Sequence, residues 1–358
     1  MRILVINAGS TSLKLALWDT GSGTSLARWK AVGIGERGHQ PDHCTALRHF
    51  ASTHPDQDLE AIGHRIVHGG PHQTPCWLDE PTLEALNALI PLAPLHQPPA
   101  LALVHAAAEL WPGIPQAAVY DTSFHRTLPP MARDYALPAS WREQGIRRYG
   151  FHGIACQDVV EQLDATRREK LVICHLGGGA SATALRRGES VDTSMGLTPL
   201  EGLMMTTRSG DVDPGALLYL MQSKGLSPEA LAQGLNTESG LLGLASDTEM
   251  SRLLARRDPV AQEAVALYAY RVRKTIGAYA AVLEGLDQLV FSGGIGERAA
   301  PLRAMICEPL HYLGLRLDPQ ANAIGATRIS AAGSSVDVRV IEVDESRVIA
   351  RLVAALPR

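Results

Sequence analysis

The sequence has little of three things that would place it in a specialised class of protein: aromatic residues, cysteine and excess charge. Aromatic residues make up 5% of the 358 residues, and the formal net charge is only −4. A chain with this slightly acidic balance has no general attraction for nucleic acid or for acidic membrane surfaces. We therefore expect small molecules as its partners, and neither nucleic acid nor a membrane.

The scarcity of cysteine excludes two kinds of site, and long apolar runs are missing as well. The five cysteines are odd in number, scattered, and without a CxxC pair, which argues against a disulfide framework or a zinc site. No stretch approaches the roughly 18 to 20 uninterrupted apolar residues of a membrane span, and the N-terminus enters a strand without the features of a secretory signal. These absences predict a cytoplasmic protein.

What the sequence does contain begins with a glycine turn between two apolar segments, "VINAGSTSLK" at residues 5–14. The preceding run is continuously apolar and the following one alternates, so we expect a β-hairpin. Its tip offers backbone N–H groups freed by Gly9, three hydroxyls and the ammonium of Lys14, which suit a phosphate. An ordinary polar hairpin turn remains the alternative.

Two further glycine turns follow later in the chain. "KLVICHLGGGASATALRRG" repeats the order of strand, glycine turn and strand, beginning at Lys170. "LVFSGGIGER", beginning at Leu289, follows a long helical run over residues 260–285 and places its glycines where a strand passes into a helix. Repetition of the unit predicts two similar α/β halves that face each other across a cleft.

A strand around residues 61–70, "AIGHRIVHGG", carries an arginine and histidines spaced by four. Four residues of a strand span about 13 Å, so His64, His68 and His72 are too far apart to share a zinc ion. Arg65 is the more informative residue, because an arginine in a half-buried strand usually holds an anion. A structural ion pair explains Arg65 equally well.

The next segment, "TLEALNALIPLAPLHQPPALALVHAAAELW", predicts two helices separated by a proline-rich loop from Pro91 to Pro99. "QAAVYDTSFH" then predicts a short strand that ends at Asp121. Buried strands commonly deliver catalytic groups at this end. The alternative role for Asp121 is to cap the turn that follows.

These segments belong to a larger set of motifs: "VINAGSTSLK", "GHRIVHGG", "APLHQPP", "YDTSFH", "YGFHG", "HLGGGAS", "TPLEGLMMTTRSGDVDPG" and "FSGGIGE". With them the chain resembles the acetokinase family of the actin, Hsp70 and hexokinase-like superfamily. The resemblance implies an α/β fold of two duplicated ribonuclease H-like domains with a central cleft, residues 1–148 and 149–344, and a C-terminal helix (345–358) that packs back on the first domain. It also implies a homodimer that exchanges a phosphoryl group between ATP and acetate, giving acetyl phosphate and ADP.

The resemblance assigns roles to individual residues, and the chemistry fits them, because cations stabilise the charge that develops during phosphoryl transfer. It places Arg65, Arg208, His152 and Asp121 at the catalytic centre, with His96 in support, and it assigns Mg²⁺, or alternatively Mn²⁺, to Asn7 and Glu345. A position in the core is the alternative for each histidine. The acid pocket implied by the resemblance comprises Arg65, Val67, Leu95, Phe151 and Pro199, whose apolar members also suit an ordinary core. The implied phosphate and nucleotide contacts are Ser10, Ser12, Lys14, His175, Gly177, Gly178, Gly179, Asp247, Gly293, Gly294, Ile295 and Gly296.

Several positions depart from the family pattern, among them Pro71 and Ser346, and four of them bear on the phosphoryl donor: Gly178, Thr248, Glu249 and Arg298. The identity of the phosphoryl donor (ATP, another nucleotide or pyrophosphate) therefore stays open. Three alternatives to an acetate-specific enzyme are a propionate or butyrate kinase of the same family, an ATP-driven binding protein of the Hsp70 or actin type, and an inactive paralogue.

Overall fold

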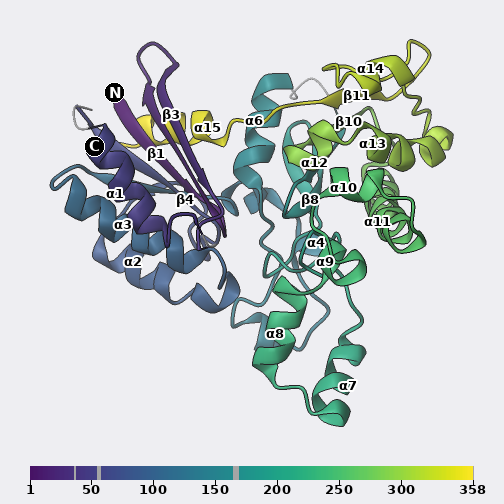
Figure 1. Cartoon of the computed structure of the whole chain (residues 1–358), viewed down its shortest axis with the longest axis horizontal. Coiled ribbons are helices and arrows are strands. Elements are labelled where there is room, and N and C mark those ends of the chain that lie inside the picture. The colour runs from purple at the N-terminus through teal and green to yellow at the C-terminus, as the bar shows by residue number, and fades with distance from the viewer. Residues whose placement is uncertain (36–37, 55–57, 164–168, 358) are drawn as a thin grey trace. The chain divides into compact units, whose positions relative to one another are not determined.

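The structure, a computed structural model, describes residues 1–35, 38–54, 58–163 and 169–357 (Figure 1). The chain forms two compact units. Unit 1 comprises Met1–Arg126, Phe151–Asp158 and Asp344–Arg358, and unit 2 comprises Thr127–Gly150 and Val159–Val343. The division of the chain into domains at residues 148 and 344 stays a prediction.

Unit 1 is built on a sheet of six strands in the order β3-β2-β1-β4-β6-β5. The strands β1, β4 and β6 are parallel neighbours, while β2, β3 and β5 pair antiparallel. The elements of this unit are β1 (Arg2–Ala8), β2 (Ser12–Asp19), β3 (Thr24–Val32), α1 (His43–Thr53), β4 (Ala61–Ile66), β5 (Cys76–Trp77), α2 (Glu80–Asn87), η1 (Ile90–Leu92), α3 (Gln97–Leu110), β6 (Gln116–Tyr120), η2 (Ser123–Thr127), the start of α6 (Gly153–Leu163) and α15 (Glu345–Ala354).

Unit 2 repeats this topology in its own sheet of five strands, β11-β10-β7-β8-β9. The strands β7, β8 and β9 form an antiparallel meander, and β10 and β11 add in parallel beside β7, as β4 and β6 do beside β1. Its elements are α4 (Pro130–Arg133), α5 (Ala139–Arg142), β7 (Lys170–Leu176), β8 (Ala180–Arg186), β9 (Glu189–Thr193), α7 (Pro214–Lys224), α8 (Pro228–Thr237), α9 (Gly240–Ala245), α10 (Met250–Ala255), α11 (Pro259–Leu283), β10 (Gln288–Ser292), α12 (Gly293–Arg298), α13 (Ala300–Cys307), η4 (Glu308–Leu313), α14 (Pro319–Ala323) and β11 (Asp337–Val340).

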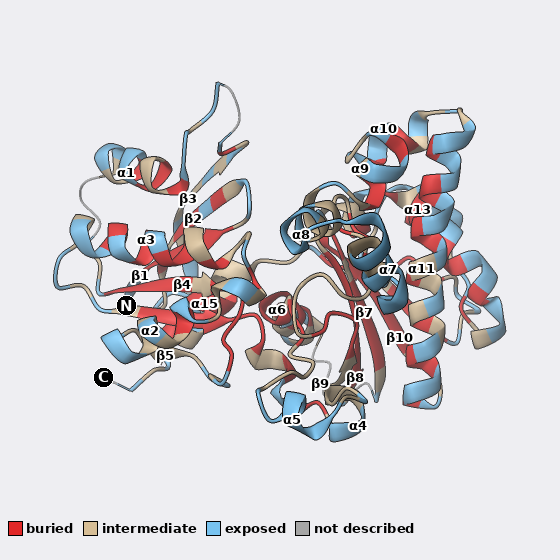
Figure 2. Cartoon of the chain, turned by 90° about the horizontal axis from the view of Figure 1, so that it is seen from below, coloured by how far each residue is buried: buried red, intermediate tan, exposed pale blue. Residues whose placement is uncertain are grey.

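Strand β1 is buried on both faces because helices cover both sides of its sheet. Leu4 and Ile6 belong to a core that includes residues of α1 and α3, whereas Ile3 and Val5 belong to a core that includes Ile349 of α15. Successive side chains of a strand point to opposite faces, so a strand between two helical layers reads as a continuous apolar run. Figure 2 shows the resulting burial along β1 and β4. Both strand–turn–strand predictions are confirmed.

The predicted proline-rich loop was too long at its C-terminal end. Helix α3 already begins at Gln97, so Pro98 and Pro99 lie in its first turn and not in the loop. Proline is tolerated there, because the first N–H groups of a helix have no partner within the helix and the fixed φ of proline suits helical backbone. The two helices flanking the loop are α2 and α3, as predicted.

No helix within the described ranges combines the length and the apolar content that crossing a bilayer requires.

Two buried histidines of unit 1 make stability depend on pH. Burial lowers the pKa of His64 and of His125 from 6.5 to about 4. The Nε2 of His64 contacts Oε1 of Gln116 at 2.6 Å, and the Nε2 of Gln116 donates to the carbonyl of Val104, so His64 is the donor in this pair. Both histidines are therefore neutral in the folded protein at pH 7.

We expect the free energy of unfolding to fall as the pH falls from 6.5 towards 4. In this range the two histidines bind protons in the unfolded chain, whereas they stay neutral in the folded chain. For His64 the loss at pH 5 is about 2 kcal/mol of unfolding free energy. Urea unfolding measures this effect. Between pH 7.5 and pH 5 the free energy of unfolding should change less in His64→Gln than in the wild type, by about this amount. His105→Gln, which removes an exposed histidine, is the control. An equal pH dependence in His64→Gln and wild type would contradict the assignment.

Candidate functional site

The first glycine turn joins β1 to β2 in a tight hairpin. The N–H of Gly9 donates to the carbonyl of Ser12 at 2.8 Å, and a Cβ at position 9 would lie 2.6 Å from the Oγ of Ser12. Ser10 and Lys14 are exposed and Ser12 is half-buried. The turn therefore presents hydroxyls and an ammonium to solvent, where an anion can reach them.

Four polar side chains meet where strands β1, β4 and β6 end. Asn7 belongs to β1, Arg65 to β4, Asp121 follows β6 directly, and Glu345 is the first residue of α15. The carboxyl ends of parallel neighbours lie at one edge of a sheet, which is where α/β proteins commonly place ligand sites. We call these four residues the Arg65 cluster.

Hydrogen bonds run through the whole Arg65 cluster. Arg65 donates twice to Asp121, Nε to Oδ1 at 3.1 Å and Nη2 to Oδ2 at 2.6 Å, in a forked geometry. Its Nη1 donates to Oδ1 of Asn7 at 3.2 Å, and the Nδ2 of Asn7 donates to Oε2 of Glu345 at 2.6 Å. The structural ion pair that the sequence left open for Arg65 is present, and its partner is Asp121.

The electrostatics of the Arg65 cluster are set by a single guanidinium near two carboxyl groups. Burial raises the pKa of Asp121, and the charge of Glu345 raises it further, whereas Arg65 lowers it. Burial alone would lower the pKa of Arg65, but Asp121 and Glu345 outweigh burial and raise it. The pKa of Asp121 is raised overall, and the guanidinium of Arg65 stays charged beside two carboxyl groups.

This donor set fits a divalent cation that prefers oxygen. The amide oxygen of Asn7 and the carboxylate of Glu345 are hard ligands. Within the described ranges there is no group of three or more His, Cys, Asp or Glu side chains that could hold a metal by itself. The fit is thus to a metal such as Mg²⁺, which uses one or two protein ligands and completes its shell with water and phosphate.

The residues predicted for the acid pocket, with His96, differ in burial. Phe151 is 1% exposed and Val67 is 4% exposed. The ring of Phe151 lies edge-on to that of His68, with ring centroids 5.4 Å apart. Leu95 is half-buried, and His96 is half-buried immediately before α3. The burial of Val67 and Phe151 suits either a pocket or a core, whereas Pro199 is half-buried, as Leu95 is.

His152 and Gly153 connect the start of α6 to the turn at Asp121. The N–H of Gly153 donates to the carbonyl of Asp121 at 3.0 Å, and a Cβ at position 153 would lie 2.1 Å from that oxygen. His152 has a positive φ of 57°, which is unusual for a residue other than glycine. Both residues are therefore held against the Asp121 turn.

In unit 2 the second and third glycine turns follow adjacent parallel strands, β7 and β10. Ser292 pairs with His175 in register, and the His175 Nδ1 lies 3.1 Å from the Ser292 Oγ. Gly293 has a φ of 74°, and a Cβ there would lie 2.7 Å from the carbonyl oxygen of Leu176. The turn at Gly177–Gly179 and the glycines of α12 therefore lie together at one edge of this sheet, and the third turn passes from strand to helix as predicted.

The segment that carries Arg208 is joined to the second glycine turn. Thr206 donates to the carbonyl of Gly178 through its N–H at 3.2 Å and its Oγ1 at 3.0 Å. Arg208 is 8% exposed, and its Nη1 donates to the carbonyl of Pro199 at 3.3 Å. Burial lowers the pKa of Arg208 to about 10, so the guanidinium stays charged at neutral pH.

At two positions expected to contact a nucleotide, the structure shows side-chain contacts that the sequence did not reveal. Asp247 pairs with Arg252, whose Nε donates to Oδ2 at 2.9 Å. The Nη2 of Arg298 lies 2.5 Å from where a Cβ on Gly294 would be, so this arginine folds over the third glycine turn. A Cβ on Gly178 would meet only the Oγ1 of Thr206, at 3.9 Å, which leaves room for a side chain.

The structure brings several of the predicted site residues together in two groups, one in each unit. Asn7, Arg65, Asp121 and Glu345 form one group, and the second and third glycine turns with His175 and the segment that carries Arg208 form the other. The sequence reasoning missed Tyr135, Arg148 and Glu201, which form a polar cluster next to the Arg208 segment. The only local signal was a carboxylate placed inside the apolar run of "TPLEGLMM".

The chain is similar to known proteins over most of its length. The family model described as "Acetokinase family" matches residues 35–351. Acetate kinase of Micrococcus luteus is 43% identical over 100% of both chains, and that of Rhodopseudomonas palustris is 41% identical over 98% of this chain and 96% of its own.

Solved structures give the same result. A propionate kinase from Francisella tularensis is 36% identical with a TM-score of 0.90, and acetate kinase of Porphyromonas gingivalis is 34% identical with a TM-score of 0.86. Both comparisons cover 98% of each chain. The predicted α/β fold of the actin and hexokinase-like type is thereby confirmed, and the chain belongs to the acetokinase family.

Proposed function

We propose that the chain is an acetate kinase that transfers a phosphoryl group reversibly between ATP and acetate. The observation that carries this proposal is the Arg65 cluster at the carboxyl ends of three parallel strands, in a chain of the acetokinase family. Acetate is already an ionised nucleophile, so no residue has to remove a proton from it. The protein must instead bring two anions together and neutralise the charge that develops.

The residues share this task as follows in our proposal. Arg65 and Arg208 supply positive charge to acetate and to the transferring phosphoryl group, and His152 donates a hydrogen bond to the latter. Asp121 fixes the guanidinium of Arg65 through the forked pair. The glycine turns, with Ser10, Ser12 and Lys14, bind the phosphates through backbone N–H groups, hydroxyls and an ammonium.

Trapping the acyl phosphate as a hydroxamate tests the proposal directly. The purified protein should form hydroxamate from acetate and ATP in the presence of Mg²⁺. Formate, propionate and butyrate as acceptors, and GTP and pyrophosphate as donors, then define both specificities. ATP hydrolysis that no short acid affects, with no hydroxamate formed, would contradict a kinase function and favour an ATP-driven binding protein.

Kinases of this family generally need a divalent metal. We propose Mg²⁺ with Asn7 and Glu345 as its protein ligands, where the ion would neutralise charge on the phosphates. Glu345→Ala should raise the Mg²⁺ concentration for half-maximal activity by about tenfold or more, because one of few protein ligands is lost.

Titrating activity with Mg²⁺ at saturating ATP measures this shift. Glu342→Ala removes an exposed carboxylate three residues earlier and should titrate like the wild type. A Glu345→Ala variant with an unaltered titration would remove Glu345 from the metal site.

A propionate or butyrate kinase is the second candidate, favoured by the similarity to the propionate kinase from Francisella tularensis. We propose that Val67 limits the length of the acid. Val67→Ala should raise the ratio of kcat/KM for butyrate over acetate by about tenfold, since one methylene in such a pocket discriminates by roughly 1 to 3 kcal/mol. An unchanged ratio with a lower Tm would mean that Val67 is only part of the core.

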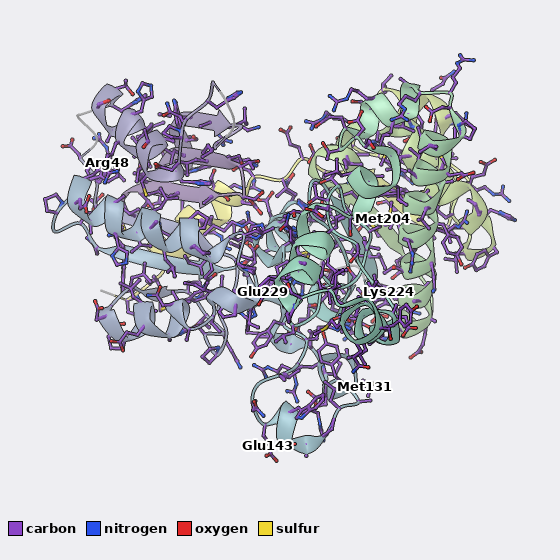
Figure 3. The ribbon with its side chains drawn as sticks, turned by 60° about the horizontal axis from the view of Figure 1, so that its bottom comes forward. Arg48, Met131, Glu143, Met204, Lys224 and Glu229 are labelled. Carbon is purple, nitrogen blue, oxygen red and sulfur yellow. The ribbon has the colours of Figure 1, made fainter. Side chains whose placement is uncertain are left out.

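We further propose a cytoplasmic homodimer in which helices α7 and α8 contact the second copy. Neither helix has a buried residue, and Leu218 and Tyr219 of α7 are 54% and 53% exposed (Figure 2). Lys224 is the last residue of α7 and Glu229 lies in the first turn of α8, and Figure 3 labels both. Sedimentation velocity should give a dimer for the wild type and a monomer for Leu218→Glu, whereas a wild-type monomer would contradict the assembly.

A further inference from the structure

Three polar side chains of unit 2, Tyr135, Arg148 and Glu201, form what we call the Glu201 cluster. The Nη2 of Arg148 donates to Oε1 of Glu201 at 2.7 Å, and the hydroxyl of Tyr135 donates to Oε2. The side chains of Arg148 and Glu201 are 17% and 33% exposed. Glu201 therefore has both carboxylate oxygens engaged, in a setting partly shielded from water.

The Glu201 cluster fixes the backbone that leads to Pro199. Arg148 donates through Nη1 to the carbonyls of three consecutive residues, 193–195, at 3.0, 3.2 and 3.2 Å. The oxygen of Tyr135 in turn accepts from the N–H of Leu197 at 3.0 Å. A Cβ on Gly196 would lie 1.6 Å from Oε2 of Glu201, so a glycine is needed for the carboxylate to approach.

This backbone provides an acceptor for Arg208. Pro199 lies between Leu197 and Glu201, both of which are held by the Glu201 cluster, and its carbonyl accepts from the Nη1 of Arg208 at 3.3 Å. An arginine side chain has about 2 kcal/mol of rotamer entropy, so a fixed acceptor is one way to hold it in one direction.

The segment that carries Arg208, residues 202–211, is also closed by hydrogen bonds between its two ends. The N–H of Gly202 donates to Oδ1 of Asp211 at 2.8 Å, and the N–H of Asp211 donates to the carbonyl of Gly202 at 2.9 Å. These contacts close the segment, but none of them reaches the guanidinium of Arg208. The Nη1 of Arg208 also donates to the Sδ of Met205 at 3.8 Å, and the carbonyl of Pro199 is the oxygen acceptor that the Glu201 cluster holds in place.

We propose that Tyr135, Arg148 and Glu201 are positioning residues for Arg208. They hold the carbonyl of Pro199, and this carbonyl directs the guanidinium towards the phosphoryl group. The inference rests on the proposed role of Arg208 in phosphoryl transfer. A half-buried ion pair adds little net stability, whereas it can specify a single arrangement of a loop.

Tyr135→Phe tests the proposal with the smallest change to the cluster. It removes one hydroxyl, which releases the N–H of Leu197 and one oxygen of Glu201. We expect kcat to fall about tenfold, which corresponds to 1.4 kcal/mol, with KM for ATP and acetate within twofold of wild type.

Tyr268→Phe is the matched control. Tyr268 is fully buried in the same unit, and its hydroxyl has no hydrogen-bond partner within the described ranges. Removing this hydroxyl should leave kcat unchanged. An unchanged kcat in Tyr135→Phe as well would overturn the proposal.

A double-mutant cycle with Arg208→Ala separates positioning from general support of the fold. If the cluster acts through Arg208, Tyr135→Phe should change kcat less than twofold in the Arg208→Ala background. An equal fractional loss in both backgrounds would show that the cluster acts without Arg208 and would overturn the inference. Full activity in Arg208→Ala alone would instead contradict the proposed role of Arg208, and the positioning role with it.

Glu201→Gln adds an independent variant, since it keeps the shape of the side chain and removes its charge. We expect a larger loss of kcat than in Tyr135→Phe, again with little change in KM, because Arg148 then loses its carboxylate partner. A loss that appears in KM alone would contradict positioning of a group that acts in the transition state.

Discussion

Arg208→Ala is expected to lower kcat by on the order of 10³, the scale found for cationic groups that stabilise phosphoryl transition states. Arg208 is 8% exposed, so its charge acts in a setting that screens it less than bulk water would. Its pKa of about 10 keeps it protonated at any pH where the reaction is assayed near neutrality. The loss should therefore appear in kcat more than in KM for either substrate.

Steady-state kinetics with acetate and ATP measure this effect, and circular dichroism checks the fold. Arg316→Ala, an exposed arginine of the same unit, is the control and should keep wild-type kcat. More than a tenth of the wild-type kcat in a folded Arg208→Ala variant would remove Arg208 from the mechanism.

Asp121→Ala is expected to lower the free energy of unfolding by about 3–5 kcal/mol, because it leaves a buried guanidinium without its forked partner. The side chains of Arg65 and Asp121 are 12% and 1% exposed, so water cannot replace the lost carboxylate readily. Glu345, 3.9 Å from the Nε of Arg65, offsets only part of the loss. Activity should fall as well, since Arg65 loses the contact that fixes its orientation.

Urea unfolding of the two proteins measures the loss in Asp121→Ala. Glu169→Ala breaks the exposed pair with Arg187 and should change stability by much less, because exposed ion pairs contribute little. Equal stability of Asp121→Ala and wild type would mean that Arg65 finds another anion or that water reaches it.

Local patterns explain why much of the fold could be predicted. The apolar runs before Gly9 and Gly177 are strands buried on both faces, and a glycine turn between such a run and a second apolar run specifies a hairpin whatever the rest of the chain does. The helix over residues 260–285 could also be predicted, because α11 spans 25 residues with regular apolar spacing. The boundary between the loop and α3 could not be predicted, since proline is compatible with both a loop and a first helical turn.

Contacts between distant residues are what the sequence could not supply. Arg65 and Asp121 are 56 positions apart, and only the pairing of β4 with β6 brings them together. The same holds for Tyr135 and Glu201, 66 positions apart, whose residue types are common and carry no signature. The resemblance to a family named the residues of the first pair, whereas nothing in the motifs pointed to the second.

The packing of α15 on the first sheet has a consequence for how the protein is made. Unit 1 contains the first residues of the chain and also Asp344–Arg358, and α15 supplies Glu345 to the Arg65 cluster. A nascent chain therefore cannot complete this cluster until residues 345–354 have left the ribosome. Until then one face of β1, with Ile3 and Val5, lacks its covering helix and is open to chaperones or to aggregation. Synthesis that stops before this helix yields a protein without a finished site, however complete its second unit is.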